Sequence, residues 1–508
     1  MQDQFTRQRL ERMMVTRRHV LAGIVGSAAA LASAKMVFGQ NTNRFRIAGS
    51  RQPLRRLPVV DTFESGQIDL TATAGRTEFF PGAASTTLGF GQSYLGPVIR
   101  MRRGNAVDAT VRNGLREHIT LHWHGLMVPA EVDGGPHLLI APGSTWSPKL
   151  AVDQPGATLW YHSHVHEKTA EQLHAGLAGV LLIDDGVDAE IGLPTTYGVD
   201  DLVLILQDKR FDDDGMSTYR PAMPDLMQGF RGETILVNGT VDPIFSVPKG
   251  IVRLRLVNAA NARIFDLSFD DGRSFNIVAT DLGLLARPVE LGRLSLAPGE
   301  RAEVLVDFGD GRPVDLVSAP DANAGRGMMG MGMMGGGSDP LDQTFPVIGF
   351  SVDPGISAYA VSIPTILANE NPPLREPVRS REFTLDDAMG PGMMMRGGPS
   401  HSINGRPFDM RRLDFAVPLG TTESWTVRAN GMAHPFHVHG ARMRVLSDGG
   451  GPAKPENAGW KDTVLVDGSA ELMVEFDQPA GRSKPFMMHC HILEHEDTGM
   501  MAQFAVET

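Results

Sequence analysis

Four His-x-His pairs, two in each half of the chain, constrain how this sequence can fold. They are His122 and His124, His162 and His164, His437 and His439, and His489 and His491. In a β-strand, residues i and i+2 point to the same face, about 6.6 Å apart. That spacing is awkward for one metal ion but suits two neighbouring ions. Because a structural role does not explain four such pairs, we expect the eight imidazoles to form one metal cluster between two domains.

The rest of the sequence predicts short β-strands. Segments such as "GVLLIDD", "IVRLRLVN" and "ELMVEF" are apolar or alternating and are bounded by Gly, Pro, Asp or Asn. The 57 Gly and 34 Pro favour many turns, and no long amphipathic helical pattern competes with the strands. A length of 508 residues allows about three domains at ~150 residues each. We therefore predict an all-β chain of β-sandwiches.

A weak internal repeat supports three related units. "RRGNAVDATVRN" (102–113), "PKGIVRLRLVN" (248–258) and "PLGTTESWTVRAN" (418–430) each contain a turn glycine, an alternating strand and a final Asn. Histidine motifs follow the first and third copies, whereas "AANARIFDLSFDDG" follows the second. We interpret the middle unit as a spacer without metal ligands.

The only cysteine, Cys490, lies between the two histidines of the last pair. On a strand its side chain points away from those of its neighbours, so it serves a different site. A small buried hydrophobe would not explain the flanking histidines. Zinc also accepts Cys and His, but a thioether ligand favours copper. The predicted ligand set of this blue-copper type of site is His434, Cys490, His495 and a weak axial Met500.

These motifs resemble those of three-domain bacterial multicopper oxidases, nearest to the copper-efflux (cuprous) oxidase and bacterial laccase branch. "LHWHG", "WYHSHVH", "HPFHVHG" and "HCHILEHEDTGMM" are the four copper motifs of that family in order, and the resemblance covers roughly residues 45–508. It implies three cupredoxin-like Greek-key β-sandwich domains, at 45–190, 197–360 and 380–508. It also implies four copper ions and four one-electron oxidations coupled to reduction of dioxygen to two waters.

The resemblance assigns a role to each motif residue. The type 1 (blue) copper takes His434, Cys490, His495 and Met500. The type 2 copper takes His122 and His437. One type 3 copper takes His124, His162 and His491, and the other takes His164, His439 and His489. Asp133 and Glu496 match positions where the family has carboxylates beside the trinuclear site, so we expect them to deliver protons and compensate charge.

Two Gly-Met segments bear on the reducing substrate. They contain Met328, Met329, Met331, Met333 and Met334 within 325–337, and Met389, Met393, Met394 and Met395 within 388–398. Thioethers select Cu(I), and these tracts lack a helical or strand period. We therefore favour copper handling over an inert loop. Met432 precedes "HPFH" and is a further candidate Cu(I) ligand, but Asn430 stands where cuprous oxidases have an acid.

Several functions remain open at this point. We favour a cuprous oxidase that also oxidises phenols, with dioxygen and either Cu(I) or a small phenolic compound as its partners. A laccase acting on phenols or aromatic amines is the main alternative. A periplasmic copper store would not need an axial Met, and a redox-inactive scaffold would be expected to have lost ligands. The net charge of −12 argues against nucleic acid, and we expect a monomer.

The N-terminus predicts export. Arginines precede the run "VLAGIVGSAAALASA" (20–34), which is too short and too rich in small residues to span a bilayer comfortably. "TRRHVL" (16–21) resembles a twin-arginine signal, and an ordinary Sec signal with two arginines is the alternative. We expect residues 1–40 to be a twin-arginine signal peptide and leader that directs the chain to the periplasm, without a stable membrane anchor.

The export prediction can be tested at the arginine pair. Changing Arg17 and Arg18 together to Lys preserves the charge but removes the receptor-read pair, so mature protein should no longer reach the periplasm. Fractionation followed by immunoblotting measures this. Normal periplasmic levels of the double variant would contradict the twin-arginine prediction.

Overall fold

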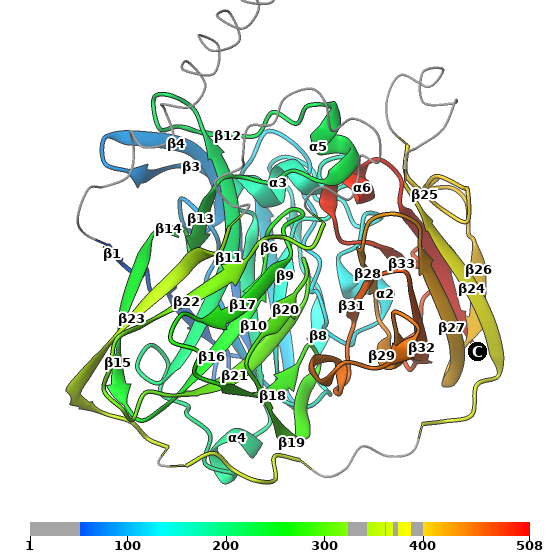
Figure 1. Cartoon of the computed structure of the whole chain (residues 1–508). Helices are drawn as coiled ribbons and strands as arrows, with labels where there is room; N and C mark the ends of the chain where they lie inside the picture. The colour runs from blue at the N-terminus through cyan, green and yellow to red at the C-terminus, as the bar shows by residue number, and fades with distance from the viewer. Residues whose placement is uncertain (1–50, 324–342, 361, 369–373, 388–399) are drawn as a thin grey trace, which may run out of the picture. The chain divides into compact units, whose positions relative to one another are not determined.

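The computed structural model describes residues 51–323, 343–360, 362–368, 374–387 and 400–508. Residues 51–508 form one compact unit, and in its described part the strands build six sheets with short helices between them (Figure 1). The predicted signal peptide lies outside the described residues. So do the methionines of both Gly-Met segments: Met328, Met329, Met331, Met333, Met334, Met389, Met393, Met394 and Met395.

The first two sheets carry the first two histidine motifs. One has the order β4-β3-β6-β7 with β8 beside β6, and the other has the order β2-β5-β10-β9. Burial alternates along β3 and β6, which directs one face of that sheet into a shared apolar core. The strands are β2 (Val59–Asp61), β3 (Gln67–Phe80), β4 (Ala83–Phe90), β5 (Val98–Arg102), β6 (Ala106–Asn113), β7 (Thr145–Trp146), β8 (Lys149–Ala151), β9 (Ala157–His162) and β10 (Ala178–Asp184).

The next two sheets form the middle sandwich around a second core. Their orders are β14-β13-β11-β16-β21-β18-β19, with β12 beside β11, and β1-β15-β23-β22-β17-β20. Although β1 lies in the range predicted for the first domain, it pairs with β15 of the middle sandwich. The strands are β1 (Gln52–Pro53), β11 (Asp201–Phe211), β12 (Ser217–Thr218), β13 (Thr234–Val237), β14 (Thr240–Val241), β15 (Pro243–Lys249), β16 (Ile251–Asn258), β17 (Phe265–Phe269), β18 (Phe275–Thr280), β19 (Gly283–Leu291), β20 (Leu294–Leu296), β21 (Arg301–Asp307), β22 (Val314–Ala319) and β23 (Phe345–Ser357).

The last two sheets carry the other two histidine motifs. Their orders are β25-β24-β27-β32-β29-β30 and β26-β34-β33-β28-β31, around a third core that includes Trp425 and Cys490. The strands are β24 (Arg379–Asp386), β25 (Ser402–Ile403), β26 (Phe415–Pro418), β27 (Thr421–Ala429), β28 (His434–Val438), β29 (Arg442–Asp448), β30 (Gly451–Pro452), β31 (Thr463–Val466), β32 (Ser469–Phe476), β33 (Phe486–Cys490) and β34 (Met501–Glu507). The predicted all-β, cupredoxin-like sandwich class is confirmed.

The three repeat segments occupy equivalent places. Their strands β6, β16 and β27 pair in parallel with β3, β11 and β24 respectively. Asn113 and Asn258 also make the same bonds: each side-chain amide donates to two main-chain carbonyls, and each side-chain oxygen accepts from the N–H two residues on. The repeat therefore reflects one strand-and-turn unit, which explains its spacing in the sequence.

The helices are short. They are α2 (Ala130–Asp133), α3 (Thr169–Ala175), α4 (Val187–Glu190), α5 (Met223–Gln228), α6 (Leu493–Asp497) and the 3₁₀ helix η1 (Pro455–Asn457). Figure 1 shows α3, α5 and α6 together, and Glu494 of α6 accepts hydrogen bonds from Tyr219 Oη and Asn261 Nδ2. In the described ranges, no helix has the length and apolarity to cross a lipid bilayer.

Candidate metal centre

Main-chain pairing aligns the histidine motifs within each half of the site. In the first sandwich, His122 and His162 form a β-bridge by exchanging N–H···O bonds of 2.9 and 3.1 Å. In the third sandwich, the register of β28 and β33 places His437 opposite His489. The histidines of the two sandwiches then meet, because the His122 ring stacks on His439 with centroids 3.8 Å apart. The structure thus brings all four predicted pairs together, and all eight side chains are buried.

Three buried carboxylates bridge the two halves of this cluster. Each contacts one histidine from the first sandwich and one from the third. Asp133 Oδ2 lies 3.2 Å from His122 Nδ1 and 2.8 Å from His439 Nδ1; Glu496 lies 3.3 Å from His164 Nδ1 and 3.1 Å from His489 Nδ1; Asp462 Oδ1 lies 3.0 Å from His124 Nε2 and 3.5 Å from His437 Nδ1. Six imidazoles are therefore oriented from outside by carboxylates, as is usual for metal-binding histidines.

The opposite ring nitrogens point into the cluster. The Nε2 atoms of His164 and His439 lie 3.2 and 3.3 Å from His489 Nε2. Buried ring nitrogens that lack a protein partner are Nε2 of His122, His162 and His437, Nδ1 of His124 and both nitrogens of His491. Buried polar atoms are nearly always bonded, so these converging nitrogens fit metal ions between them. His164, His439 and His489 could hold one ion, as the prediction for one type 3 copper requires.

Burial makes these imidazoles good metal ligands. It lowers the pKa of His164 and of His439 well below the ordinary value, and that of His437 to about 4. A neutral imidazole has a free lone pair, which a metal ion requires. At neutral pH these rings therefore present lone pairs to a cation without first losing a proton.

A second cluster surrounds Cys490. Its Sγ lies 3.4 Å from His434 Nδ1 and 3.9 Å from His495 Nδ1, and the two Nδ1 atoms are 3.3 Å apart. The Met500 side chain is buried, and its main-chain carbonyl accepts a hydrogen bond from Cys490 N–H. A thiolate, two imidazoles and a nearby thioether are the donor set of a blue-copper site. The predicted type 1 residues are thus brought together.

Burial also sets the state of the thiol. It raises the pKa of Cys490 well above the ordinary value, and the Ile492 N–H donates to Sγ at 3.3 Å. The thiol is therefore protonated unless a cation binds, and binding of copper releases that proton.

Two carboxylates at these sites had no signal in the sequence. Asp387 Oδ1 lies 3.1 Å from His434 Nε2, on the side of the ring away from Cys490, and its side chain is 18% exposed. Asp462, the residue before β31, contacts His124 and His437 of the histidine cluster. His401, which we assigned no copper, stacks on His495 with centroids 3.9 Å apart.

Met432, a candidate Cu(I) ligand, has a buried side chain. It is 2% exposed and packs in the core of the third sandwich. Its main-chain N–H instead lies 3.5 Å from Asp387 Oδ2. This position argues against Met432 as a substrate ligand and favours the neighbouring Asp387 carboxylate.

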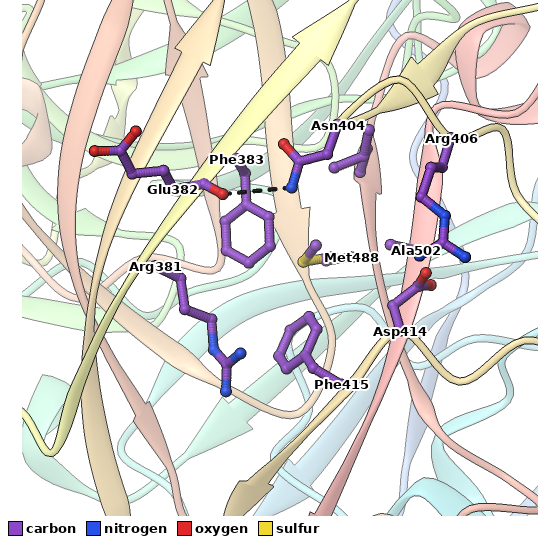
Figure 2. Close-up of a pocket in the computed structure, with 10 residues that line it drawn as sticks. Arg381, Glu382, Phe383, Asn404, Arg406, Asp414, Phe415, Met488 and Ala502 are labelled. Atoms are coloured by element: carbon purple, nitrogen blue, oxygen red, sulfur yellow. Dashed lines mark hydrogen bonds between the residues drawn. The ribbon is translucent and has the colours of Figure 1, made fainter.

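A pocket of about 320 Å³ opens beside β33 (Figure 2). Phe383 and Phe415 line it, with ring centroids 5.8 Å apart, and Met488 borders it two residues before Cys490. Figure 2 shows Arg381 and Arg406 around these apolar groups. None of the candidate copper ligands lines this pocket, so it is separate from both clusters.

Comparison with known families gives one consistent match. Three family models described as multicopper oxidase match residues 71–188, 158–315 and 375–508. Among curated proteins, the chain is similar to the cell division protein FtsP of Escherichia coli strain K12, with 36% identity over 90% of this chain and 93% of the relative. FtsP of Yersinia pestis is 37% identical over 91% of this chain and 93% of its own.

Solved structures agree. A laccase-like multicopper oxidase, CueO of Ochrobactrum sp., described as active towards lignin model compounds, is 42% identical with a TM-score of 0.82, covering 89% of this chain and 100% of that one. A laccase from Pediococcus acidilactici is 34% identical with a TM-score of 0.78, covering 91% and 94%. A multicopper oxidase from Campylobacter jejuni, described as a metallo-oxidase, is 27% identical with a TM-score of 0.76, covering 90% and 95%.

Proposed function

This chain belongs to the multicopper oxidase family, and from that premise we propose that it couples one-electron oxidation of a reducing substrate to four-electron reduction of dioxygen to water. The observation that supports this most is the convergence of unpartnered ring nitrogens in the histidine cluster, next to a separate Cys–His₂ cluster. A complete donor set in both places suits redox catalysis better than a purely structural role. We also propose that the chain is exported to the periplasm and works as a monomer.

Copper bound in the two clusters would supply the one-electron redox chemistry. The chain supplies the connection, because Cys490 is directly bonded through the backbone to His489 and His491. The thiol faces one cluster, and the two flanking imidazoles face the other. An electron that enters beside His434 or His495 therefore has a short covalent route to the trinuclear histidines.

Dioxygen reduction to water also consumes four protons. Asp133 and Glu496 are the carboxylates that could pass them, since each contacts two histidines of the cluster and has no arginine or lysine partner among the described residues. Each could hold a proton at the edge of the cluster and release it inward. Their contacts also orient the histidines, so we propose both roles.

We propose Cu(I) as the main reducing substrate. Asp387 places a partly exposed carboxylate 3.1 Å from His434 Nε2. A Cu(I) ion bound by this carboxylate could pass its electron to the His434 ring. The Gly-Met segment 388–398 follows Asp387 directly, which brings soft thioethers next to it in the sequence.

Phenol oxidation is the second candidate. The similarity to a laccase-like enzyme active towards lignin model compounds favours it, and so does the uncharged Asn430. A role in cell division is a further candidate, because the curated relatives carry that name. Such a role would not by itself require an intact blue-copper donor set.

The blue-copper assignment predicts a colour. Copper-loaded protein should be blue through thiolate-to-copper charge transfer, and Cys490→Ser should be colourless and inactive, because serine cannot supply that transition. Visible absorption and oxygen uptake measure both effects, and a retained type 2 EPR signal shows that the variant is folded. Persistence of the intense visible band would refute the assignment. In a deletion strain, the same variant would still support division if the chain acts there as a redox-inactive scaffold.

The proton role predicts slow turnover without loss of copper. Asp133→Asn and Glu496→Gln keep the shape of each side chain but remove its ability to carry a proton. Oxygen uptake should fall by ~10²-fold or more while the blue colour remains. Glu131→Gln, an exposed residue of the same helix as Asp133, is the matched control and should behave as the parent. Unchanged turnover in both test variants would exclude the role.

The substrate proposal predicts different effects on Cu(I) oxidation and on phenol oxidation. Asp387→Asn should lower Cu(I) oxidation at low copper concentration about tenfold, because a charged contact to His434 is lost, and should leave phenol oxidation unchanged. Deleting 326–337, or changing Met393, Met394 and Met395 to Ser, should lower Cu(I) turnover while phenol oxidation stays the same or rises.

Asp386→Asn is the control for that experiment, since Asp386 accepts from Gly405 N–H at 2.7 Å instead of contacting His434. Steady-state rates for Cu(I) and one phenol on the same preparations decide the outcome. If every variant retains parental Cu(I) kinetics, the enzyme is a general laccase.

A further inference from the structure

Asp462 differs from the other two carboxylates of the histidine cluster. The Arg301 guanidinium donates two hydrogen bonds to Asp462, from Nη1 to Oδ1 at 2.7 Å and from Nη2 to Oδ2 at 2.5 Å. This paired fork is the most directional form of a charged hydrogen bond. Arg301 begins β21 of the middle sandwich, whereas Asp462 belongs to the third. The sandwich without copper ligands thus makes contact with a residue that holds His124 and His437.

Arg301 is itself fixed from every side. It is fully buried, and its five side-chain N–H groups all find acceptors. Besides the two bonds to Asp462, Nη1 donates to Gly299 O at 2.9 Å, Nη2 to Asp281 O at 2.9 Å and Nε to Thr158 O at 3.2 Å. Thr158 lies in β9 of the first sandwich. One guanidinium therefore joins three sandwiches, and it cannot swing away without breaking several buried bonds.

The same turn also contacts a second part of the cluster. Gly299 has φ +86°, and a Cβ on it would lie 2.9 Å from Cγ and Cδ2 of the His491 ring. His491 makes no hydrogen bond through either ring nitrogen, so packing alone sets its orientation. The turn that contains Gly299 is bonded to the second repeat segment, because Gly299 N–H donates to the carbonyl of Asn258 at 2.9 Å.

The first sandwich makes room for this pair. Gly125, directly after His124 in "LHWHG", has φ +88°, and a Cβ there would lie 2.7 Å from both Arg301 Nη2 and Asp462 Oδ2. Only glycine combines this backbone conformation with such a close approach. Gly125 therefore makes the turn after His124 and also leaves space for the Arg301–Asp462 pair.

We infer that the turn 297–301 of the middle sandwich is a positioning element for the trinuclear copper site. Arg301 holds Asp462, and through it His124 and His437, while Gly299 supports the His491 ring. The middle sandwich is then not a spacer, because three of the eight cluster histidines depend on it. This inference rests on the proposed function, since it concerns histidines that would bind copper.

Arg301 variants test the inference by copper retention. In Arg301→Lys the charge remains but the fork is lost, so Asp462 is less well fixed. The type 2 copper should leave to a chelator about 10- to 100-fold faster than in the parent, while the blue band keeps its parental intensity. The double variant Arg301→Met with Asp462→Asn, which removes both charges of the Arg301–Asp462 pair, should lose the type 2 copper at least as fast. Type 2 EPR amplitude and copper per chain are the readouts.

Arg263→Lys is the matched control for Arg301→Lys. Arg263 is also a buried arginine of the middle sandwich, and its Nε donates to Asp208 at 2.8 Å, but it contacts none of the cluster histidines. The control variant should retain type 2 copper as the parent does. Equal copper loss in Arg263→Lys and Arg301→Lys would mean that general destabilisation is responsible and would overturn the inference.

Gly299→Ala tests the second contact independently. Its control is Gly311→Ala, because Gly311 has a similar φ of +74° in the same sandwich but nothing within 4 Å of its Cβ position. Backbone strain is thus shared, and only Gly299→Ala pushes on His491. Trinuclear copper should be lost faster in Gly299→Ala alone.

If Gly299→Ala and Gly311→Ala lose trinuclear copper at the same rate, the proposed role of the Gly299 contact is refuted. If Arg301→Lys and the double variant both match the parent in EPR and chelator release, the Arg301 contact is refuted while the proposed function stands. If the parent itself binds no copper, the proposed function falls and the inference with it.

Discussion

The metal centre depends on three buried carboxylates, each shared between a histidine of the first sandwich and one of the third. A carboxylate removed from water is costly unless it is paired and hydrogen-bonded. Neither sandwich alone supplies both partners, so the full set of contacts forms only when the two come together. The same contacts turn the free ring nitrogens inward, which is why a site for metal ions lies at this boundary.

Charge explains why metal suits the site. Burial keeps several of the cluster imidazoles neutral and Cys490 protonated. The three carboxylates add negative charge, and of these three only Asp462 is paired with a buried arginine. Cations bound between the imidazoles would compensate the negative charge of Asp133 and Glu496. Metal binding and docking of the sandwiches are thus expected to favour one another, because ligands held in two domains gain affinity when those domains are fixed.

The three sandwiches use one strand-and-turn unit in different ways. Asn113 and Asn258 close equivalent turns with the same hydrogen bonds, and the second of these turns supports Gly299 against His491. In the third sandwich the exposed Asn430 stands at the end of the repeat strand, and the chain continues directly into His434. The same scaffold element therefore supports the histidine cluster in one unit and leads to the proposed blue-copper ligand in another.

The sequence by itself determined the sandwich class and separated the four His-x-His pairs from Cys490, because side chains two residues apart in an extended chain share a face while the residue between them points the other way. His434, His495 and Met500 were grouped with Cys490 by their donor chemistry. It could not reveal Asp387, Asp462 or Arg301 as parts of the sites. Asp462 lies 338 residues from His124, and no local spacing relates a carboxylate to a ring it meets only after folding. For the same reason, the position of Met432 before "HPFH" did not reveal that its side chain packs in the core. The type and spacing of the ligands are thus local properties of the chain, whereas their orientation and charge arise from contacts between domains, which only the tertiary structure decides.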